Sequence, residues 1–373
     1  MMLRDLERIL LNLKDYCKMS TYKLKDFVDP IAITVQNPAK SGYERFVGLE
    51  HYDSGELVIK RYSGVELLTT NAKAFQKNDI LIARRNVYLR RAGVIYFNGI
   101  TSGDSIVLRV KADCKAQTGV NRELAQKVLP LVLNTDKFWI YANKHADGMN
   151  SKRISKDMLM EYEFDLPSLE EQKVLADKLW AAYRVKEAYR QLLATTDDML
   201  KAKFQKMFGE EKNMRVWKDV LTILNGKAYP NEYLSEGPYP IYGSGGIMGY
   251  AEDYLFSENT IIVGRKGNIN SPILVKEKYW AVDTAFSLNI DTSILDPLYF
   301  YEWCCLFDFT YFNKQGVLPS LTRSDLYTIN MPVPPIEKQQ EFAAIYTQAE
   351  ATKASLRESI ASIDRVIRSL INQ

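Results

Sequence analysis

The sequence predicts an α+β protein in which two similar mixed α/β domains alternate with two long helices. The first observation is a repeat, because LPSLEEQ at 166–172 recurs as VPPIEKQ at 333–339, at a constant offset of 167 residues. The second is the absence of Pro and Gly from 168–208 and from 336–371. The third is that short β-rich runs bounded by turn residues precede each phrase. The chain is therefore interpreted as a duplicated unit of one domain and one helix.

Length and composition limit the class of protein. A chain of 373 residues with 46% hydrophobic and 25% charged residues favours two or more domains. Four Cys without a C-x-x-C pair and only two His leave little material for a metal site or a His-based triad, and we expect neither. Apolar runs are strand-sized, and the first residues lack a signal-peptide pattern. We therefore expect a cytoplasmic protein that does not span a membrane.

The two expected domains follow a short N-terminal helical segment, 1–20. The first domain is predicted over 21–165 and the second over 213–335. Turn residues separate the predicted strands of the first domain, which are Arg45–Leu49, Glu56–Arg61, Asp79–Ala83, Gly93–Phe97 and Ser105–Val110, with a helix over Asn121–Leu133. The second domain has predicted strands Asn259–Gly264, Pro272–Val275 and Phe286–Ile290, with a helix over Pro297–Phe307.

The spacer segments are predicted over 166–212 and 336–373. The first holds a helix that ends before Gly209, a residue that favours helix termination. Residues suited to a helix seam recur there every seventh position in two series, Val174, Ala181, Ala188, Thr195 and Ala202, and Val185, Leu192 and Met199. This spacing predicts a second helix close by. The candidate is the C-terminal helix, where the same period is kept by Phe342, Ala349, Leu356, Ile363 and Leu370. Ordinary helix-bundle core is the alternative; at 1.5 Å per residue each helix is roughly 50–60 Å long.

The recurring phrase is the joint between each domain and its helix. Pro167 and Pro334 keep the chain extended before the helix begins. Glu170 and Glu337 then lie in the first helical turn, where unpaired amides favour a carboxylate.

The glycine-rich stretch YGSGGIMGY at 242–250 departs from a phosphate-binding loop. Position 248, where the third glycine is needed, is Met248, and Pro240 and Ile241 make a poor preceding strand. A turn-rich loop that joins short strands is the expectation, and the chain carries no evident catalytic motif.

Basic and polar side chains gather in short stretches. One, ARRNVYLRR at 83–91, has no acidic residue and carries Arg84, Arg85, Asn86, Tyr88, Arg90 and Arg91. Such a group is unfavourable unless an anion neutralises it, and Arg and Asn can bind base edges as well as phosphates. Similar candidates are Arg265, Lys266, Asn268 and Asn270 in GRKGNINSP, Lys152 and Arg153 in MNSKRISK, and Arg323 in PSLTRS. The alternative is a solvated face or local ion pairs.

The two domains differ in charge. Residues 21–165 carry 22 Lys and Arg against 17 Asp and Glu, whereas 213–335 carry 9 against 13. If the second domain binds nucleic acid, it must do so through a local patch.

These residues resemble the DNA specificity subunit of type I restriction-modification systems. The resemblance is carried by the two joints with their helices, by SGDSIVLRV and WAVDTAFSL, and by PIYGSGGIMGY. It implies two target recognition domains, each reading half of a split site in double-stranded DNA through the major groove. It also implies a pseudo-two-fold internal repeat whose domains are held apart by two antiparallel helices, a coiled-coil spacer.

The resemblance further implies a chain without catalysis or a cofactor of its own. Two modification subunits, which carry S-adenosylmethionine, and restriction subunits are the implied protein partners. The implied partner-binding and spacer residues are Pro167, Glu170, Gln172, Leu192, Met199, Pro334, Glu337, Gln339, Leu356 and Ile363. The alternatives are a two-module scaffold or decoy that binds modification subunits without DNA, and a self-contained enzyme based on the glycine-rich loop.

Overall fold

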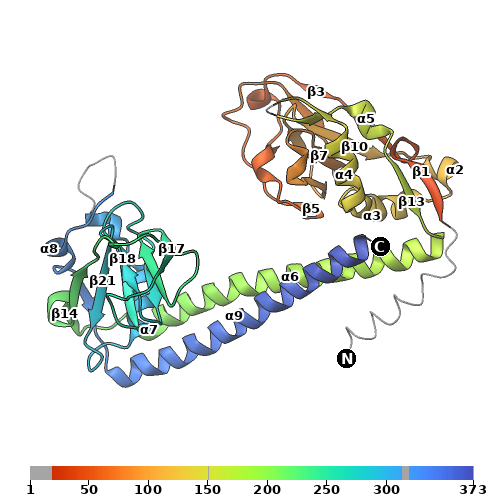
Figure 1. The fold of residues 1–373 in the computed structure, drawn as a ribbon. Coiled ribbons are helices and arrows are strands. Elements are labelled where there is room, and N and C mark those ends of the chain that lie inside the picture. Colours follow the sequence, from red (N-terminus) through yellow and green to blue (C-terminus); the bar gives the residue numbers. More distant parts are fainter. Residues whose placement is uncertain (1–18, 150, 313–318, 373) are drawn as a thin grey trace. The chain divides into compact units, whose positions relative to one another are not determined.

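A computed structural model describes residues 19–149, 151–312 and 319–372. The chain forms two compact units, one of residues 1–188 with 359–373 and one of residues 189–358. Each unit holds a sheet-rich domain and a stretch of both long helices (Figure 1). The α+β class with an internal repeat is confirmed, whereas the expected N-terminal helical segment lies almost wholly outside the described residues. The segment limits expected from the sequence stay a prediction.

The first domain is built on a five-stranded sheet in the order β2-β10-β7-β8-β5. These strands are β2 (Val28–Ile31), β10 (Ser105–Val110), β7 (Ile80–Ala83), β8 (Ala92–Ile95) and β5 (Val58–Ile59). A four-stranded sheet, β3-β6-β9-β4, adjoins it. Its strands are β3 (Thr34–Val35), β6 (Ala72–Phe75), β9 (Gly99–Thr101) and β4 (Phe46–Val47). The central strands β7 and β8 are buried along their whole length, as expected for strands covered on both faces.

Helices cover the five-stranded sheet. The expected helix α3 (Arg122–Val132) is present, whereas α4 (Asp136–Lys144) was not predicted. Each begins at a polar residue whose side chain accepts a hydrogen bond from the amide three residues later, Asn121 from Leu124 N and Thr135 from Phe138 N. The pair α3 and α4 brings Phe138 and Trp139 into the core. Short elements complete the domain: α2 (Cys114–Thr118), α5 (Lys156–Met160), β11 (Ala146–Asp147) and β12 (Arg153–Ile154).

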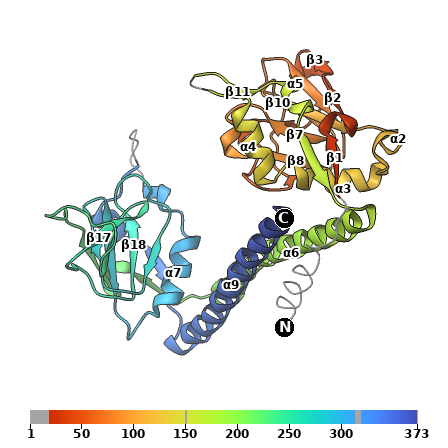
Figure 2. The ribbon, with the colours of Figure 1, turned by 45° about the vertical axis from the view of Figure 1, so that its right-hand side comes forward.

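The second domain has a four-stranded sheet, β15-β21-β18-β19, and a three-stranded sheet, β17-β16-β20. The strands are β15 (Leu221–Asn225), β21 (Ala285–Ile290), β18 (Thr260–Gly264), β19 (Ile273–Val275), β17 (Gly246–Ala251), β16 (Tyr239–Gly243) and β20 (Trp280–Ala281). Helix α7 (Pro297–Leu306) lies beside β18 (Figure 2). The short helix α8 (Arg323–Leu326) follows the undescribed residues 313–318.

The expectation for the glycine-rich stretch was wrong in one respect. Residues Tyr239–Gly243 form a true strand that pairs with β17 on one side and β20 on the other. Pro240 is tolerated there because the parallel pairing with β20 begins only at Ile241. The nitrogen of Pro240 is therefore not needed as a donor on that side.

The two domains close on their joints in the same way. The first strand of each domain pairs with its last, β1 (Ser20–Lys23) with β13 (Glu163–Leu166), and β14 (Met214–Val216) with β22 (Asn330–Pro332). At each joint a buried glutamine, Gln172 or Gln339, donates its side-chain amide to the carbonyl of the joint proline, 2.8 Å in both cases. This shared hydrogen bond accounts for the recurring Pro and Gln of the phrase, while Glu170 and Glu337 remain exposed.

The long helices are α6 (Leu169–Phe208) and α9 (Ile336–Ile371). The predicted seam of α9 is confirmed, since Phe342, Ala349, Leu356 and Leu370 are buried and Ile363 is partly buried. The predicted seam of α6 was wrong: its exposed fractions are 45% for Val174, 43% for Val185, 46% for Leu192 and 47% for Met199.

A different face of α6 is buried. In the first unit it presents Ala176, Leu179 and Tyr183, and in the second Leu200, Phe204 and Phe208. Large apolar and aromatic side chains remove more surface from water than Val, Ala and Thr. The face of α6 that carries the larger apolar and aromatic side chains therefore turns toward the core.

Within each unit, α6 and α9 run antiparallel and are joined by a buried lysine. In the first unit Lys186 on α6 lies 2.8 Å from Asp364 on α9. In the second, Lys353 on α9 lies 2.6 Å from Asp197 on α6. The offset of 167 relates Lys186 to Lys353 and Asp197 to Asp364, so the two ion pairs are the same interaction with the helices exchanged. Such reciprocity is the signature of a two-fold repeat.

Lys186 is expected to stabilise the first unit strongly. Its buried ammonium also contacts Glu56 of the first domain at 2.8 Å, so Lys186→Ala removes the cation from two carboxylates. We expect a loss of free energy of unfolding on the order of 3 kcal/mol, measured by thermal denaturation. Lys173→Ala, which changes an exposed lysine of the same helix, is the control. Equal transition temperatures for both variants would contradict the prediction.

Candidate nucleic-acid interface

Two of the predicted basic stretches meet in the first domain. The backbone of 84–86, directly after β7, pairs with that of 152–154. The side chains join as well, because Arg85 Nε donates to Ser151 Oγ at 2.7 Å. Sequence reasoning predicted each stretch, and the structure brings them together.

Several cations surround one carboxylate at this place. Asp104 accepts a hydrogen bond from Arg153 Nε at 3.1 Å and lies 3.6 Å from Arg85 Nη1. Arg84 lies close enough that its charge acts on Lys73, whose ammonium donates to the carbonyls of Gly103 and Ser105. We call Lys73, Arg84, Arg85, Lys152 and Arg153 the cation cluster. It carries several positive charges around one acid, an arrangement that favours a bound anion.

The electrostatics of Lys73 reflect this crowding. Burial lowers the pKa of its ammonium below the usual value, the neighbouring Arg84 lowers that pKa further, and Asp104 opposes the change. The Nε of Arg84 is buried without a hydrogen-bond partner among the described residues. Sequence reasoning missed both Lys73 and Asp104, because Lys73 lies on β6 and Asp104 lies in the turn before β10, far along the chain from the arginines.

The other predicted residues of 83–91 differ in what they contact. Arg91 donates to the carbonyls of Leu49 and Arg85, each at 3.1 Å, so its guanidinium supports the backbone. Arg90 forms an ion pair with Asp136 at the start of α4. Asn86 has a left-handed backbone with φ of 54°. Tyr88 is exposed and free to contact a ligand.

The second domain repeats the backbone frame of this site with other side chains. In the first domain the hydrogen bonds are Arg84 N to Asp104 O at 2.8 Å, Ile154 N to Arg84 O at 3.0 Å and Asn86 N to Lys152 O at 2.8 Å. In the second they are Arg265 N to Thr284 O at 2.7 Å, Leu321 N to Arg265 O at 2.9 Å and Gly267 N to Pro319 O at 3.0 Å. The stretches 264–268 and 319–321 therefore occupy the places of 83–87 and 152–154.

The predicted residues of the second domain fall into two kinds. Lys266, Asn268 and Arg323 are exposed, and Arg265 donates from Nη1 to the carbonyl of Asp283 at 3.2 Å. Asn270 instead accepts a hydrogen bond from Phe309 N at 2.8 Å, which links the loop to the segment after α7. Asn270 thus has a structural contact of its own.

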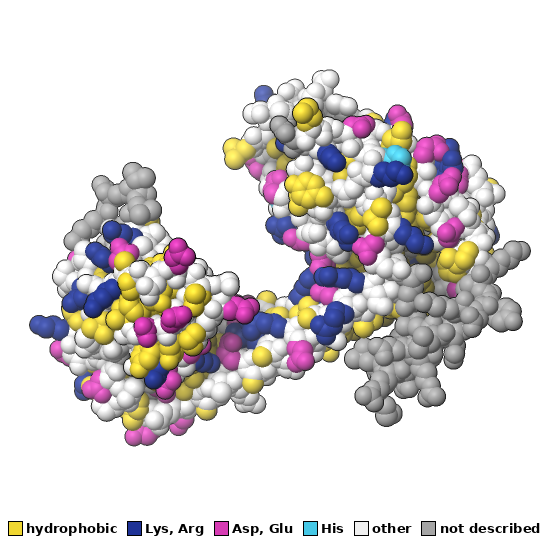
Figure 3. Space-filling view, in the orientation of Figure 1, with side chains coloured by type: hydrophobic (Ala, Val, Ile, Leu, Met, Phe, Trp, Pro, Cys, Tyr) yellow, Lys and Arg dark blue, Asp and Glu magenta, His cyan; other side chains and the backbone are white. Residues whose placement is uncertain are grey.

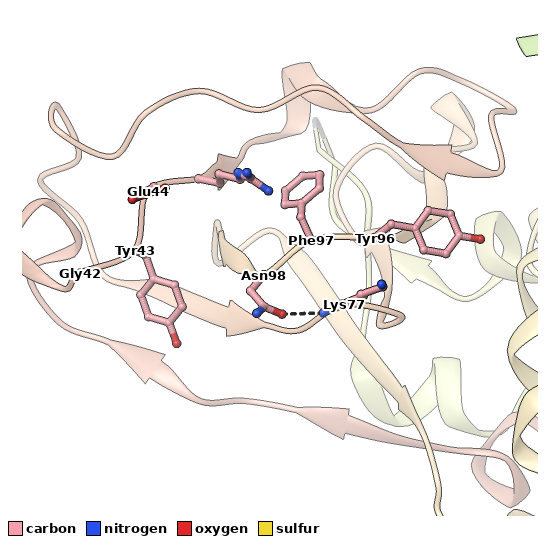
Figure 4. A pocket seen from close by; sticks show the side chains of 8 residues that line it. Gly42, Tyr43, Glu44, Lys77, Tyr96, Phe97 and Asn98 are labelled. Carbon is pink, nitrogen blue, oxygen red and sulfur yellow. Dashed lines mark hydrogen bonds between the residues drawn. The ribbon is translucent and has the colours of Figure 1, made fainter. Parts of the chain in front are cut away.

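A separate pocket of about 430 Å³ lies elsewhere on the first domain, lined by Gly42, Tyr43, Glu44, Arg45, Lys77, Tyr96, Phe97 and Asn98. Figure 4 shows the Asn98 side chain reaching the backbone of Lys77, whose amide donates to it at 2.9 Å. The Arg45 guanidinium lies over the rings of Tyr62 and Phe97, at 5.1 and 5.2 Å from their centres. The side-chain oxygen of Asn98 and the guanidinium of Arg45 therefore already have partners within the domain, and no predicted site residue lines the pocket.

The described residues contain no group of three or more His, Cys, Asp and Glu side chains suited to a metal ion. They also contain no helix long and apolar enough to cross a membrane. Of the predicted partner-binding residues, Leu192 and Met199 are exposed on α6, whereas Pro334, Gln339 and Leu356 are buried.

Comparisons with known proteins give one family match and several solved structures of similar fold. The sequence model of one protein family, described as the type I restriction modification DNA specificity domain, matches this chain twice, over residues 18–193 and 209–365. The crystal structure of a type I restriction-modification S subunit from M. genitalium has a TM-score of 0.58 at 15% identity, covering 96% of each chain. A structure from work on complex assembly and conformational transition of the type I R-M system has a TM-score of 0.55 at 17% identity, covering 95% of this chain and 96% of that one. Such identities show the fold alone, and no curated protein matches significantly.

Arg91 and Arg153 are expected to differ in their effect on stability. Arg91→Ala leaves two backbone carbonyls without their donor, so we expect it to lower the free energy of unfolding by about 1–3 kcal/mol. Arg153→Ala removes a partly exposed ion pair and should change it by less than about 1 kcal/mol. Thermal unfolding of both variants measures the difference, and the reverse order would contradict the assignment of Arg91 to the framework.

Proposed function

Because the chain belongs to the type I restriction modification DNA specificity family, we propose that its two domains each read one half of a split DNA site. In this family the specificity subunit recognises DNA and has no catalytic role. The observation that carries the proposal is the repeated loop frame. It presents Arg84, Arg85, Lys152 and Arg153 in the first domain, and Arg265, Lys266 and Asn268 in the second. Two matching frames on one chain suit two matching contacts on one duplex.

The cation cluster supplies the chemistry for the first half-site. Phosphates are the anions that its excess positive charge favours, and they position a protein on the duplex. Arg85 and Arg153 retain N–H groups beyond those bonded to Ser151 and Asp104, and an arginine fork can bind guanine in the major groove. The exposed Tyr88 and Lys152 lie on the same loops.

The long helices are proposed to space the domains and to dock partners. Helix α6 runs from the first unit into the second without a break, and such a rod can hold two reading sites at a set separation, as dimer spacing does in palindromic readers. The exposed Leu192 and Met199 offer apolar contact to modification subunits. We propose that S-adenosylmethionine belongs to those partners and that restriction subunits join the same assembly.

The DNA contact is tested with the double variant Lys152→Ala/Arg153→Ala. We expect weaker binding to duplex DNA. The slope of log affinity against log salt should be smaller by about 1 if Lys152 alone contacts a phosphate and by about 2 if Arg153 does so as well, because each lost phosphate contact contributes about 1. Binding is measured by fluorescence anisotropy over a salt series, with Lys115→Ala, an exposed lysine outside the cluster, as control. A scaffold or decoy that does not touch DNA predicts the same result for both variants.

The partner contact is tested on the exposed face of α6. Leu192→Glu places a charge on the apolar stripe and should reduce co-purification with co-expressed modification subunits at least tenfold. Gln191→Glu adds the same charge to the adjacent exposed position and should leave assembly intact. DNA binding by the chain alone should be unchanged in both. Normal assembly of the Leu192→Glu variant would remove this face from the proposed docking surface.

A further inference from the structure

The glycine-rich hairpin β16–β17 has no role in the function proposed so far. Its turn lies against the basic loop of the second domain. A Cβ placed on Gly264 would come within 3.1 Å of Ser244 Cβ, and one on Gly267 within 3.4 Å of Ser244 Oγ. The tip of the hairpin is therefore continuous with the loop that carries Arg265 and Lys266.

This hairpin shows two large apolar side chains to solvent. The exposed fraction is 52% for Ile247 and 54% for Met248. Met248 extends over Gly243 on the neighbouring strand, because a Cβ on Gly243 would lie 2.6 Å from the Met248 sulfur. The missing side chain at Gly243 gives Met248 its place, and a Cβ there would also lie 3.6 Å from Oγ1 of Thr284, whose carbonyl belongs to the loop frame.

The negative net charge of the second domain favours binding through apolar contacts at this hairpin. Residues 213–335 carry 9 Lys and Arg against 13 Asp and Glu, so long-range attraction to phosphates is weak there. On the face of the second domain seen in Figure 3, hydrophobic side chains gather beside Lys and Arg side chains. A duplex bound here has to gain free energy from short-range contacts as well as from charge.

We propose that Ile247 and Met248 contact thymine methyl groups in the major groove of the second half-site. This inference rests on the function proposed above. Strand β20 pairs with β16 only at Ile241 and Tyr242, so the turn end of the hairpin is two-stranded. A two-stranded ribbon fits the major groove, and the thymine C5-methyl is the apolar group that a base pair presents there. The neighbouring Arg265, Lys266 and Asn268 supply the polar contacts to the same groove. The pair thus acts as a specificity determinant for A·T pairs.

The experiment begins with selection from a library of random duplexes by the full chain, assembled with co-expressed modification subunits. We expect a split consensus with at least one thymine in one half. Replacing the thymines of that half by deoxyuridine removes only the methyl groups, and we expect about a fourfold loss of affinity per methyl contacted. The same replacement in the other half is the internal control.

Met248→Ala then identifies the side chain. This variant should bind the thymine and deoxyuridine duplexes equally and should keep the salt dependence of the unchanged protein. Met214→Ala, which alters another exposed methionine of the same domain away from the loop frame, should retain the discrimination.

The outcomes separate the two proposals. If no sequence is enriched, the proposed function itself fails. If a split consensus is enriched but deoxyuridine binds as well as thymine in both halves, or Met248→Ala still discriminates, the inference is overturned while the function stands. Insertion of the two side chains between bases from the minor groove would give that second pattern.

Discussion

The buried lysine that joins α6 to α9 is the interaction on which the organisation of each unit depends. It occurs once as Lys186 with Asp364 and once as Lys353 with Asp197. A lysine is buried between two helices at acceptable cost only where a carboxylate pairs with it. Each ion pair therefore favours one register of α6 against α9. Each joint leads directly from a domain into a long helix. The register of the two helices therefore also determines where the joint lies relative to the other helix of the same unit.

How much of the fold could be predicted depended on whether local pattern or long-range burial decided it. Strands such as β7 and β10 and the stripe of α9 follow from local pattern alone. The inward face of α6 did not, because the heptad series through Leu192 competed with a second face ending in Phe204 and Phe208. A heptad pattern does not show which face of a helix contacts another helix. In α6 the face with the larger apolar side chains is buried.

The same division applies to the candidate interface. Sequence predicted the arginines after β7 and the basic stretch near Arg153, since both are dense in charge. It could not predict that Asp104 lies among them or that Lys73 joins from another strand, because these contacts depend on sheet order. Nor could it separate Arg91, which holds backbone carbonyls, from its neighbours. Similar side chains take framework or ligand roles according to contacts far along the chain.

The loop frame of the two domains is held by main-chain hydrogen bonds that do not depend on which side chains project from it. Arg84, Arg85 and Asn86 stand in one copy where Arg265, Lys266 and Gly267 stand in the other, on matching backbone bonds. Asn86 and Gly267 are restricted by their left-handed backbones, with φ of 54° and 81°. At the other two positions a replacement should lower the free energy of unfolding only slightly. New target preferences can then arise by single substitutions, without first requiring compensating changes in the scaffold.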